Sequence, residues 1–347
     1  MFFTTRIAVA LVCFVLAADS VGTIQGGGAA FPARLEHYLT HGAKLTPDER
    51  NRLLNGQPVT KMLDADETKE LSVFAAAWIN GSMRRYVEGV KDIETFERGG
   101  GFKTTKRIGT PPRLEDFREF RLPDEDLDDL RYCRVGSCEI SLGEQALKQF
   151  QSEIDWAAPN ARAAANGLVQ RLALEYVTRY LKGGNDQLAV YRDRSRPRFI
   201  AQEFRAMIDQ MPELTTYMPD VRRYLLDYPK VTMPNATSLL YWQEVVFGLK
   251  PTLRITHLTV RDGGDDVLVT SKMLYASHYF WTGLELRALM SDPSRGKGFW
   301  LVTVSRSRSD GLDGFTGMVL RGRVRTEVEE GALRALQWTK KWLEGAP

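Results

Sequence analysis

The sequence predicts an α+β fold: an antiparallel sheet grips a long C-terminal helix, and a mainly helical block is inserted between the sheet-forming parts. Three observations predict it. Short apolar segments divided by polar turns occupy residues 57–110 and recur from residue 250 onward. Between them, residues 124–248 carry apolar side chains at helical spacing, with Pro and Gly at the limits of the segments. The final pattern, 315–344, is long enough for one helix lying across a sheet.

The first sheet-forming part follows a predicted helix. Residues 46–49, Thr-Pro-Asp-Glu, combine an N-cap, a proline suited to the first helical position and a capping-box glutamate. We therefore expect residues 23–56 to hold a Gly/Ala-rich leader and this helix, which ends at Asn55-Gly56. The elements expected in residues 57–110 are strands at 58–63, 71–79 and 102–109, and a helix at 83–96 that Ser82 caps.

Residues 111–249 are expected to form the inserted helical block, which opens with a Pro-rich linker. A second capping box, from Ser141 to Glu144, predicts the start of a helix that runs to about residue 154. Further helices are expected at 161–182, 186–192, 197–210, 213–227 and 238–247. The aromatic side chains of this block either pack a helical core or line a binding groove: Phe150, Trp156, Tyr176, Tyr180, Tyr191, Phe204, Tyr217, Tyr224, Tyr228, Tyr241 and Trp242.

The second sheet-forming part, residues 250–347, contains four predicted strands and the final helix. The strands are expected at 253–261, 267–280, 284–290 and 299–308. Their short connections favour antiparallel pairing. A curved sheet that grips a long helix can leave a cavity between the two, and such cavities often hold ligands.

This order of elements resembles the START-like, helix-grip fold of lipid-transfer and polyketide-binding proteins, over roughly residues 57–109 and 250–344. The resemblance lies in the pattern of elements and not in a sequence motif, and the long helical insertion departs from it. It implies a pocket for an apolar ligand, sometimes with transport and less often with catalysis, but fold analogy alone supplies no chemistry. The chain also resembles exported bacterial proteins as a class.

The N-terminus has the features of a signal peptide, which we assign to residues 1–22. Arg6 precedes an uninterrupted apolar run of 12 residues, Ile7–Ala18, and small residues follow it. Cleavage is expected after Ala18, Ser20 or Gly22, and the alternative is an uncleaved anchor. Since no later segment approaches the length of a membrane span, we expect an exported protein, periplasmic or secreted, without a stable span after cleavage.

Charge and motifs disfavour several classes of function. The formal net charge is +3, both signs are mixed along the chain, and we find no basic block, so nucleic acid is not an expected partner. The common nucleophile, metalloprotease, phosphate-loop and dinucleotide signatures are absent from the sequence. We expect no cofactor and no metal site, and the sequence identifies no catalytic residues.

Cysteine usage agrees with export. After cleavage Cys133 and Cys138 remain, separated by four residues that include a glycine. Two nearby cysteines in an oxidising compartment usually pair, so a disulfide is predicted.

Polar residues within the predicted strands are the candidate ligand contacts. Alternation places Lys272 and His278 on one face of the 267–280 strand and Tyr275 on the other. His257, on the neighbouring strand, is expected to meet His278, and a histidine is a natural acid, base or pH switch. The alternative is that these histidines are hydrogen-bonded within the sheet or lie on the surface.

A second candidate contact is the arginine pair near the end of the last strand. Arg306 and Arg308 share a face, and two guanidiniums at the mouth of an apolar pocket suit a carboxylate or phosphate headgroup. Asp310 is expected to orient one of them, and the alternative is two solvent-exposed arginines.

Three hypotheses of function follow. The first is a protein that binds or carries a hydrophobic or amphiphilic small molecule, with an anionic head at the arginines. The second is an envelope enzyme that uses a His/Lys/Tyr acid–base cluster and requires His257 and His278 within hydrogen-bond reach. The third is a structural or interaction protein of the cell envelope that binds through its helical block.

Overall fold

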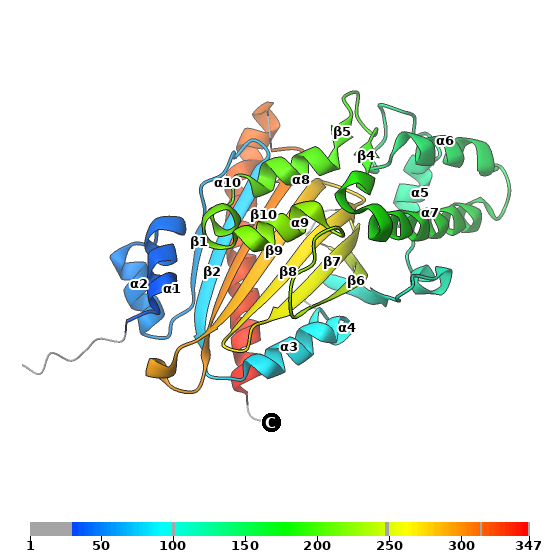
Figure 1. Cartoon of the computed structure of the whole chain (residues 1–347). Helices are drawn as coiled ribbons and strands as arrows, with labels where there is room; N and C mark the ends of the chain where they lie inside the picture. Colours follow the sequence, from blue (N-terminus) through cyan, green and yellow to red (C-terminus); the bar gives the residue numbers. More distant parts are fainter. Residues whose placement is uncertain (1–29, 99–100, 247–249, 313, 346–347) are drawn as a thin grey trace, which may run out of the picture.

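The computed structural model describes residues 30–98, 101–246, 250–312 and 314–345, with only the backbone of residues 314–320. Its centre is one eight-stranded antiparallel sheet, which confirms the predicted fold class (Figure 1). The strand order is β1-β2-β10-β9-β8-β7-β6-β3. The strands are β1 (Val59–Met62), β2 (Glu70–Ile79), β3 (Phe102–Ile108), β6 (Ala236–Val245), β7 (Thr252–Asp262), β8 (Asp266–Ala276), β9 (Phe280–Ser291) and β10 (Phe299–Ser309).

One face of the sheet is covered by α3 (Met83–Lys91), α4 (Ile93–Phe96) and the long C-terminal helix α10 (Gly314–Glu344). The long helix crosses β1 and β2 (Figure 1). Its side chains Leu336 and Leu343 pack in the core between the helix and the sheet. The packing of this helix on the sheet agrees with the sequence. The helix predicted at 83–96 is divided into α3 and α4 at Asp92.

The opposite face is covered by α1 (Ala33–His37), the π-helix η1 (Tyr38–Gly42), α2 (Pro47–Leu54), α8 (Ile200–Ile208) and α9 (Pro219–Asp227). Phe31 lies in a stretch expected to be a leader, but it is buried with its ring 4.9 Å from that of Trp300. Phe31 therefore belongs to a packed core, although it precedes the first predicted helix. The capping box at Thr46 is confirmed, because its hydroxyl accepts from Glu49 N at 3.2 Å and Glu49 Oε2 accepts from Thr46 N at 2.7 Å.

Most of the remaining helices belong to the inserted block and cover the β6–β7 end of the sheet. They are the 3-10 turn η2 (Leu114–Phe117), α5 (Asp124–Leu130), α6 (Glu144–Glu153), α7 (Ala161–Gly183) and the 3-10 turn η3 (Gly184–Gln187). A two-stranded hairpin, β4 (Val190–Tyr191) and β5 (Arg198–Phe199), follows η3. These elements form a third core with Leu240 and Trp242 of β6 and Leu253 and Ile255 of β7, on the face opposite α10 (Figure 1).

Two helices predicted in the block are wrong. Residues 238–247 were expected to be helical, but Ala236–Val245 form β6, which pairs with β3 and β7. Both faces of this strand are apolar, since Leu239 and Leu240 lie in different cores, and a short continuous apolar run does not distinguish a buried strand from a helix. Residues 186–192, also predicted helical, contain the end of η3 and strand β4.

The capping box predicted at Ser141 is also wrong. Helix α6 has Gly143 as its N-cap and no side-chain cap. Ser141 is buried instead, and its backbone N–H donates to the Ser277 carbonyl at 2.8 Å, beyond the end of β8. The position of Ser141 is therefore fixed by packing against the sheet, and its side chain does not cap the helix.

Candidate functional site

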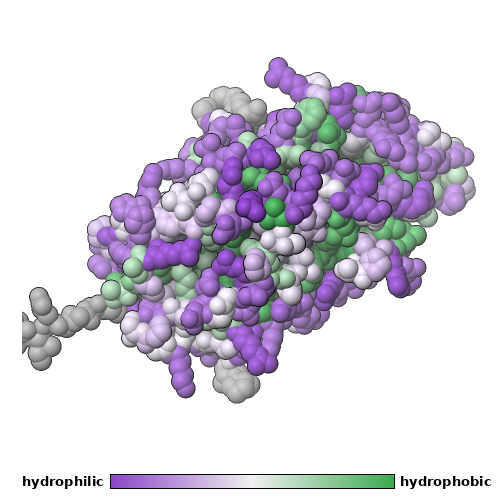
Figure 2. All heavy atoms as spheres, in the orientation of Figure 1, coloured by the Kyte–Doolittle hydropathy of each residue, from purple (hydrophilic) through white to green (hydrophobic). Residues whose placement is uncertain are grey.

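A cavity of about 390 Å³ lies between the helical block and the sheet. Its walls come from α6, α7, the hairpin strand β4, and strands β7 and β8. The apolar lining includes Leu122, Phe150, Val169, Leu172, Ala173, Tyr176, Leu188, Tyr191, Leu253, Ile255 and Tyr275. Figure 2 shows apolar atoms gathered on this side of the molecule, below the position of α7 in Figure 1.

The cavity is on the face of the sheet opposite α10. The sequence placed a cavity between residues 253–308 and the final helix, where Leu336 and Leu343 instead pack in a core with Ala77 and Leu301. The helix that roofs the observed cavity is α7, from the inserted block. Of the residues expected to contact a ligand, Tyr275 lines it.

Polar side chains line the cavity as well as apolar ones. Glu175, Arg179, Asp186 and Gln187 lie along one side and are exposed to solvent. Glu144, on another side, is paired with Lys148 at 2.7 Å and with Arg192 at 3.6 Å. A ligand in this cavity would meet apolar walls within and charged groups of both signs toward solvent.

Beside the cavity, His257 of β7 lies directly opposite Lys272 of β8 in the sheet register. Both side chains are buried, with 4% and 1% of their surface exposed. The Tyr180 hydroxyl, from α7, joins them, since it lies 2.9 Å from His257 Nδ1 and accepts from Lys272 Nζ at 3.4 Å. The structure therefore brings together two residues that the sequence singled out, and adds a tyrosine.

The Lys272 amine has an unusual environment. It donates to Asn185 Oδ1, and it lies 4.4 Å from the ring centroid of Phe204 and 5.0 Å from that of Tyr180. Among the described residues, no carboxylate forms an ion pair with it. A lysine buried without a counter-charge loses affinity for its proton, and burial lowers the pKa of Lys272 to about 7.

The same burial acts on the other two groups of this cluster. Burial first, and then the nearby Lys272 amine, lower the pKa of His257 to about 3. Burial raises the pKa of the Tyr180 hydroxyl well above its ordinary value. Near neutral pH the cluster therefore holds a neutral imidazole, a neutral phenol and an amine that can exchange a proton. Groups whose pKa values are shifted in this way are typical of functional sites.

This cluster lies immediately behind the cavity wall. Tyr176, which lines the cavity, precedes Tyr180 by one helical turn, and Asn185 is followed by the lining residue Asp186. Gly184 makes this approach possible, because its φ is +61° and a Cβ there would lie 1.7 Å from the Tyr228 carbonyl oxygen. Because glycine adopts a positive φ at little cost, the chain can turn sharply from α7 into η3, and this turn places Asn185 next to Lys272.

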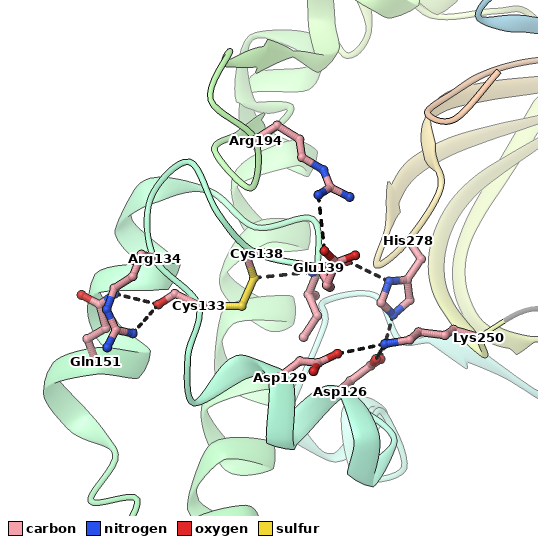
Figure 3. The surroundings of a disulfide bond; sticks show 11 residues. Asp126, Asp129, Cys133, Arg134, Cys138, Glu139, Gln151, Arg194, Lys250 and His278 are labelled. Carbon is pink, nitrogen blue, oxygen red and sulfur yellow. Dashed lines mark hydrogen bonds and ion pairs between the residues drawn. A yellow bond between two sulfur atoms is a disulfide. The ribbon is translucent and has the colours of Figure 1, made fainter. Parts of the chain in front are cut away.

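His278 belongs to a different cluster (Figure 3). Its Nε2 lies 2.8 Å from Asp126 Oδ2, and its Nδ1 lies 3.0 Å from the Glu139 carbonyl oxygen. Lys250, beside them, is paired with Asp129 at 2.8 Å. Because both His278 nitrogens have their own partners, the expectation that His278 meets His257 is wrong.

The predicted disulfide is present between Cys133 and Cys138, whose Cα atoms are 4.6 Å apart (Figure 3). Both cysteines are buried. The bridge closes the loop that leads into Glu139, whose carbonyl is the His278 partner. The disulfide thus holds together a loop that contacts the turn between β8 and β9.

Arg306 and Arg308 share a face of β10 as predicted, but that face lies under α8 and both side chains are buried. Each donates through Nε to the Glu70 carboxylate of β2, at 2.8 and 2.7 Å. Glu70 and Glu203 therefore together orient these arginines. The Asp310 backbone N–H donates to the Tyr279 carbonyl at 2.7 Å.

The sequence interpretation named Tyr180 only as one of the aromatic residues of the helical block, and it missed Asn185 and Glu70. All three act as partners from distant segments. The sequence interpretation also missed a local signal, an arginine at every second position from Arg192 to Arg198. These arginines belong to the β4–β5 hairpin, next to the cavity wall.

No group of three or more His, Cys, Asp or Glu side chains within the described ranges could hold a metal ion. In the same part of the chain, no helix is both long and apolar enough to cross a membrane. The predicted signal peptide lies outside the described residues. Comparison of the chain with models of known protein families and with curated proteins finds no match.

The buried amine makes the first testable prediction. Between pH 7 and about 9.5, unfolded Lys272 keeps its proton while folded Lys272 has lost it, so the unfolded state binds more protons and stability rises with pH. We expect the unfolding free energy of the wild type, minus that of Lys272→Met, to increase by about 3 kcal/mol across this window. Urea unfolding at several pH values measures it. Exposed Lys148→Met is the matched control, and an equal pH dependence in all three proteins would contradict the assignment.

The arginine pair makes a second prediction. Glu70→Gln leaves two buried guanidiniums without their shared counter-charge, so we expect it to lower the unfolding free energy by about 3 kcal/mol. Glu67→Gln, which removes a carboxylate that is 55% exposed, should leave stability unchanged within error. Urea unfolding of both variants compares them, and equal stabilities would show that the pair has little effect on folding.

Proposed function

We propose that this is an exported protein that binds or carries a hydrophobic or amphiphilic small molecule. The observation that carries the proposal is the cavity of about 390 Å³ between α7 and strands β7 and β8. Ligand pockets typically measure roughly 300 to 1,000 Å³, with mostly apolar walls and a few polar groups that fix orientation. The walls and rim of this cavity have that composition.

The position of the cavity changes the expected place of the headgroup. Arg306 and Arg308 form ion pairs with Glu70 beneath α8 and do not line the cavity. The polar end of a ligand would instead lie toward Arg179, Gln187 and the acidic residues beside them. We therefore propose an amphiphile whose apolar body enters the cavity and whose polar end stays at this solvent-facing side.

Export is part of the same proposal. It rests on the signal-peptide pattern at residues 1–22, and the buried disulfide between Cys133 and Cys138 supports an oxidising destination. In a periplasmic or secreted protein, a cavity of this kind would serve to bind or carry a ligand outside the cytoplasm.

Filling the cavity tests the proposal. Ala173 is buried on α7 and lines the cavity, so Ala173→Phe should place a ring in the ligand volume. We expect the affinity for 1-anilinonaphthalene-8-sulfonate, measured by fluorescence titration, to fall about tenfold or more. Native mass spectrometry of the gently purified wild type should show a bound small molecule that the variant lacks.

Ala164→Phe on the exposed side of the same helix is the matched control and should bind like the wild type. Val169→Phe, at a second lining position, repeats the test if Ala173→Phe does not fold. Equal affinity in the wild type and in a folded cavity-filled variant would refute the proposal.

The amine cluster supports a second candidate, an enzyme that carries out acid–base chemistry at Lys272, His257 and Tyr180. The specific observation is a buried amine that no carboxylate of the described residues pairs with, hydrogen-bonded through Tyr180 to a histidine. Because His278 has other partners, the two-histidine form of this hypothesis is set aside.

Chemical trapping tests whether a ligand can reach that amine. An unprotonated lysine adds to an aldehyde and loses water to give an imine, which borohydride reduces to a stable secondary amine. We expect cinnamaldehyde and borohydride at neutral pH to label Lys272 before the exposed lysines, because a solvated lysine amine in general keeps its proton at neutral pH and is then not nucleophilic. Peptide mapping by mass spectrometry identifies the site, and Lys272→Met should lose that label. Labelling confined to surface lysines would exclude this candidate.

A further inference from the structure

Exposed apolar side chains are concentrated at one end of the helical block. Of the six large hydrophobic residues exposed among those the structure describes, four lie in two neighbouring segments, the loop 131–139 and the hairpin 190–199. They are Tyr132, Val135, Val190 and Phe199, exposed by 71, 39, 38 and 46%. We call these two segments together the basic loop surface.

The two segments of the basic loop surface are joined by the backbone. Gly136 N–H donates to the Arg192 carbonyl at 2.7 Å, and Cys138 N–H donates to the Asp193 carbonyl at 2.9 Å. The disulfide closes the first segment on itself, and Arg194 of the hairpin points to Glu139 at 3.4 Å (Figure 3). The apolar side chains are thus presented from a connected platform.

The outward direction of the hairpin side chains follows from their pairing. Val190 and Phe199 are direct partners in β4 and β5, so they project to the same side of the hairpin. The other pair, Tyr191 and Arg198, turns inward. There the Arg198 guanidinium carbon lies 3.6 Å from the ring centroid of Trp281. Val190 and Phe199 therefore each present an apolar side chain, more than a third exposed, on the outer side of the hairpin.

The basic loop surface also carries more positive than negative charge. It holds six arginines against two acidic residues, Glu139 and Asp193. Three of its arginines have carboxylate partners: Arg192 with Glu144, Arg194 with Glu139 and Arg198 with Glu203. Arg131, Arg134, Arg194 and Arg196 are exposed.

The acidic helix α5, which precedes this surface, directs its carboxylates to residues outside the surface. Two cations pair with four of these five carboxylates, and His278 contacts the fifth. Asp124 and Asp128 bind Arg162, Glu125 and Asp129 bind Lys250, and Asp126 binds His278.

We propose that the basic loop surface docks this protein onto an anionic lipid bilayer. Arginines attract the negative headgroups, and aromatic and aliphatic side chains between them insert at the interface, a combination typical of peripheral membrane binding. Charge complementarity selects an anionic bilayer over a neutral one. Val190 belongs both to this surface and to the cavity lining, so a docked molecule would hold the cavity next to the lipid. The docking does not require that the cavity bind a ligand.

Vesicle co-sedimentation of the full chain tests the proposal. We expect the wild type to pellet with vesicles of equimolar phosphatidylcholine and phosphatidylglycerol, to stay in solution with phosphatidylcholine alone, and to be released by rising salt. Phe199→Ser, and separately Arg194→Gln combined with Arg196→Gln, should each weaken binding about tenfold.

Trp338→Ser is the matched control. Trp338 is 47% exposed, as much as Phe199, but it belongs to α10 on another part of the molecule, so its loss should leave binding intact. The proposal is overturned if the wild type does not pellet with anionic vesicles. An acidic protein would then be the partner to test for this surface. The proposal is equally overturned if Trp338→Ser weakens binding as much as Phe199→Ser. Binding of the fluorescent probe to the cavity, measured on the same variants, separates this outcome from failure of the ligand-binding proposal.

Discussion

Burial of the sheet on both faces is the constraint on which the rest of the structure depends. All ten residues of β2 are buried, and β6 to β10 contribute side chains to cores on opposite faces. A sheet of this kind requires helices on both sides. The C-terminal helix with α3 and α4 covers one face, and the inserted block with the N-terminal helices covers the other. The helical block is therefore a structural layer of the molecule, and the cavity forms where that layer meets the strands.

The helices that cover the face opposite α10 bury several charged side chains of the sheet. His257, Lys272, Leu284 and Arg306 lie in one row across four neighbouring strands, on the face that the block and α8 cover. Burial of a charge is costly unless a counter-charge accompanies it. Arg306 has Glu70 as its counter-charge. Among the described residues, the partners of Lys272 are an amide, a phenol and two aromatic rings, with no carboxylate. The same layer thus contains one structural ion pair and one amine with a perturbed proton affinity.

The inserted block combines three features within a short distance. It roofs the cavity with α7, supplies Tyr180 and Asn185 to the Lys272 amine, and carries the basic loop surface at its outer end. In a START-like arrangement the C-terminal helix would take the ligand-facing role. Here the long helix packs directly on the sheet, and the ligand-sized space lies under the helical block.

The sequence by itself determined the local elements: most strands, their antiparallel pairing, the Thr46 cap, the long final helix and the Cys133–Cys138 pair. These depend on periodicity, turn residues and neighbours close along the chain, which a single sequence displays. Only the tertiary structure decided that 236–245 is a strand, which face each helix covers, and which partner each buried polar residue takes. Glu70 lies 236 positions from Arg306, and Tyr180 lies 77 from His257. Such pairings are set by how the layers stack, and no local pattern records which distant segment will supply the partner.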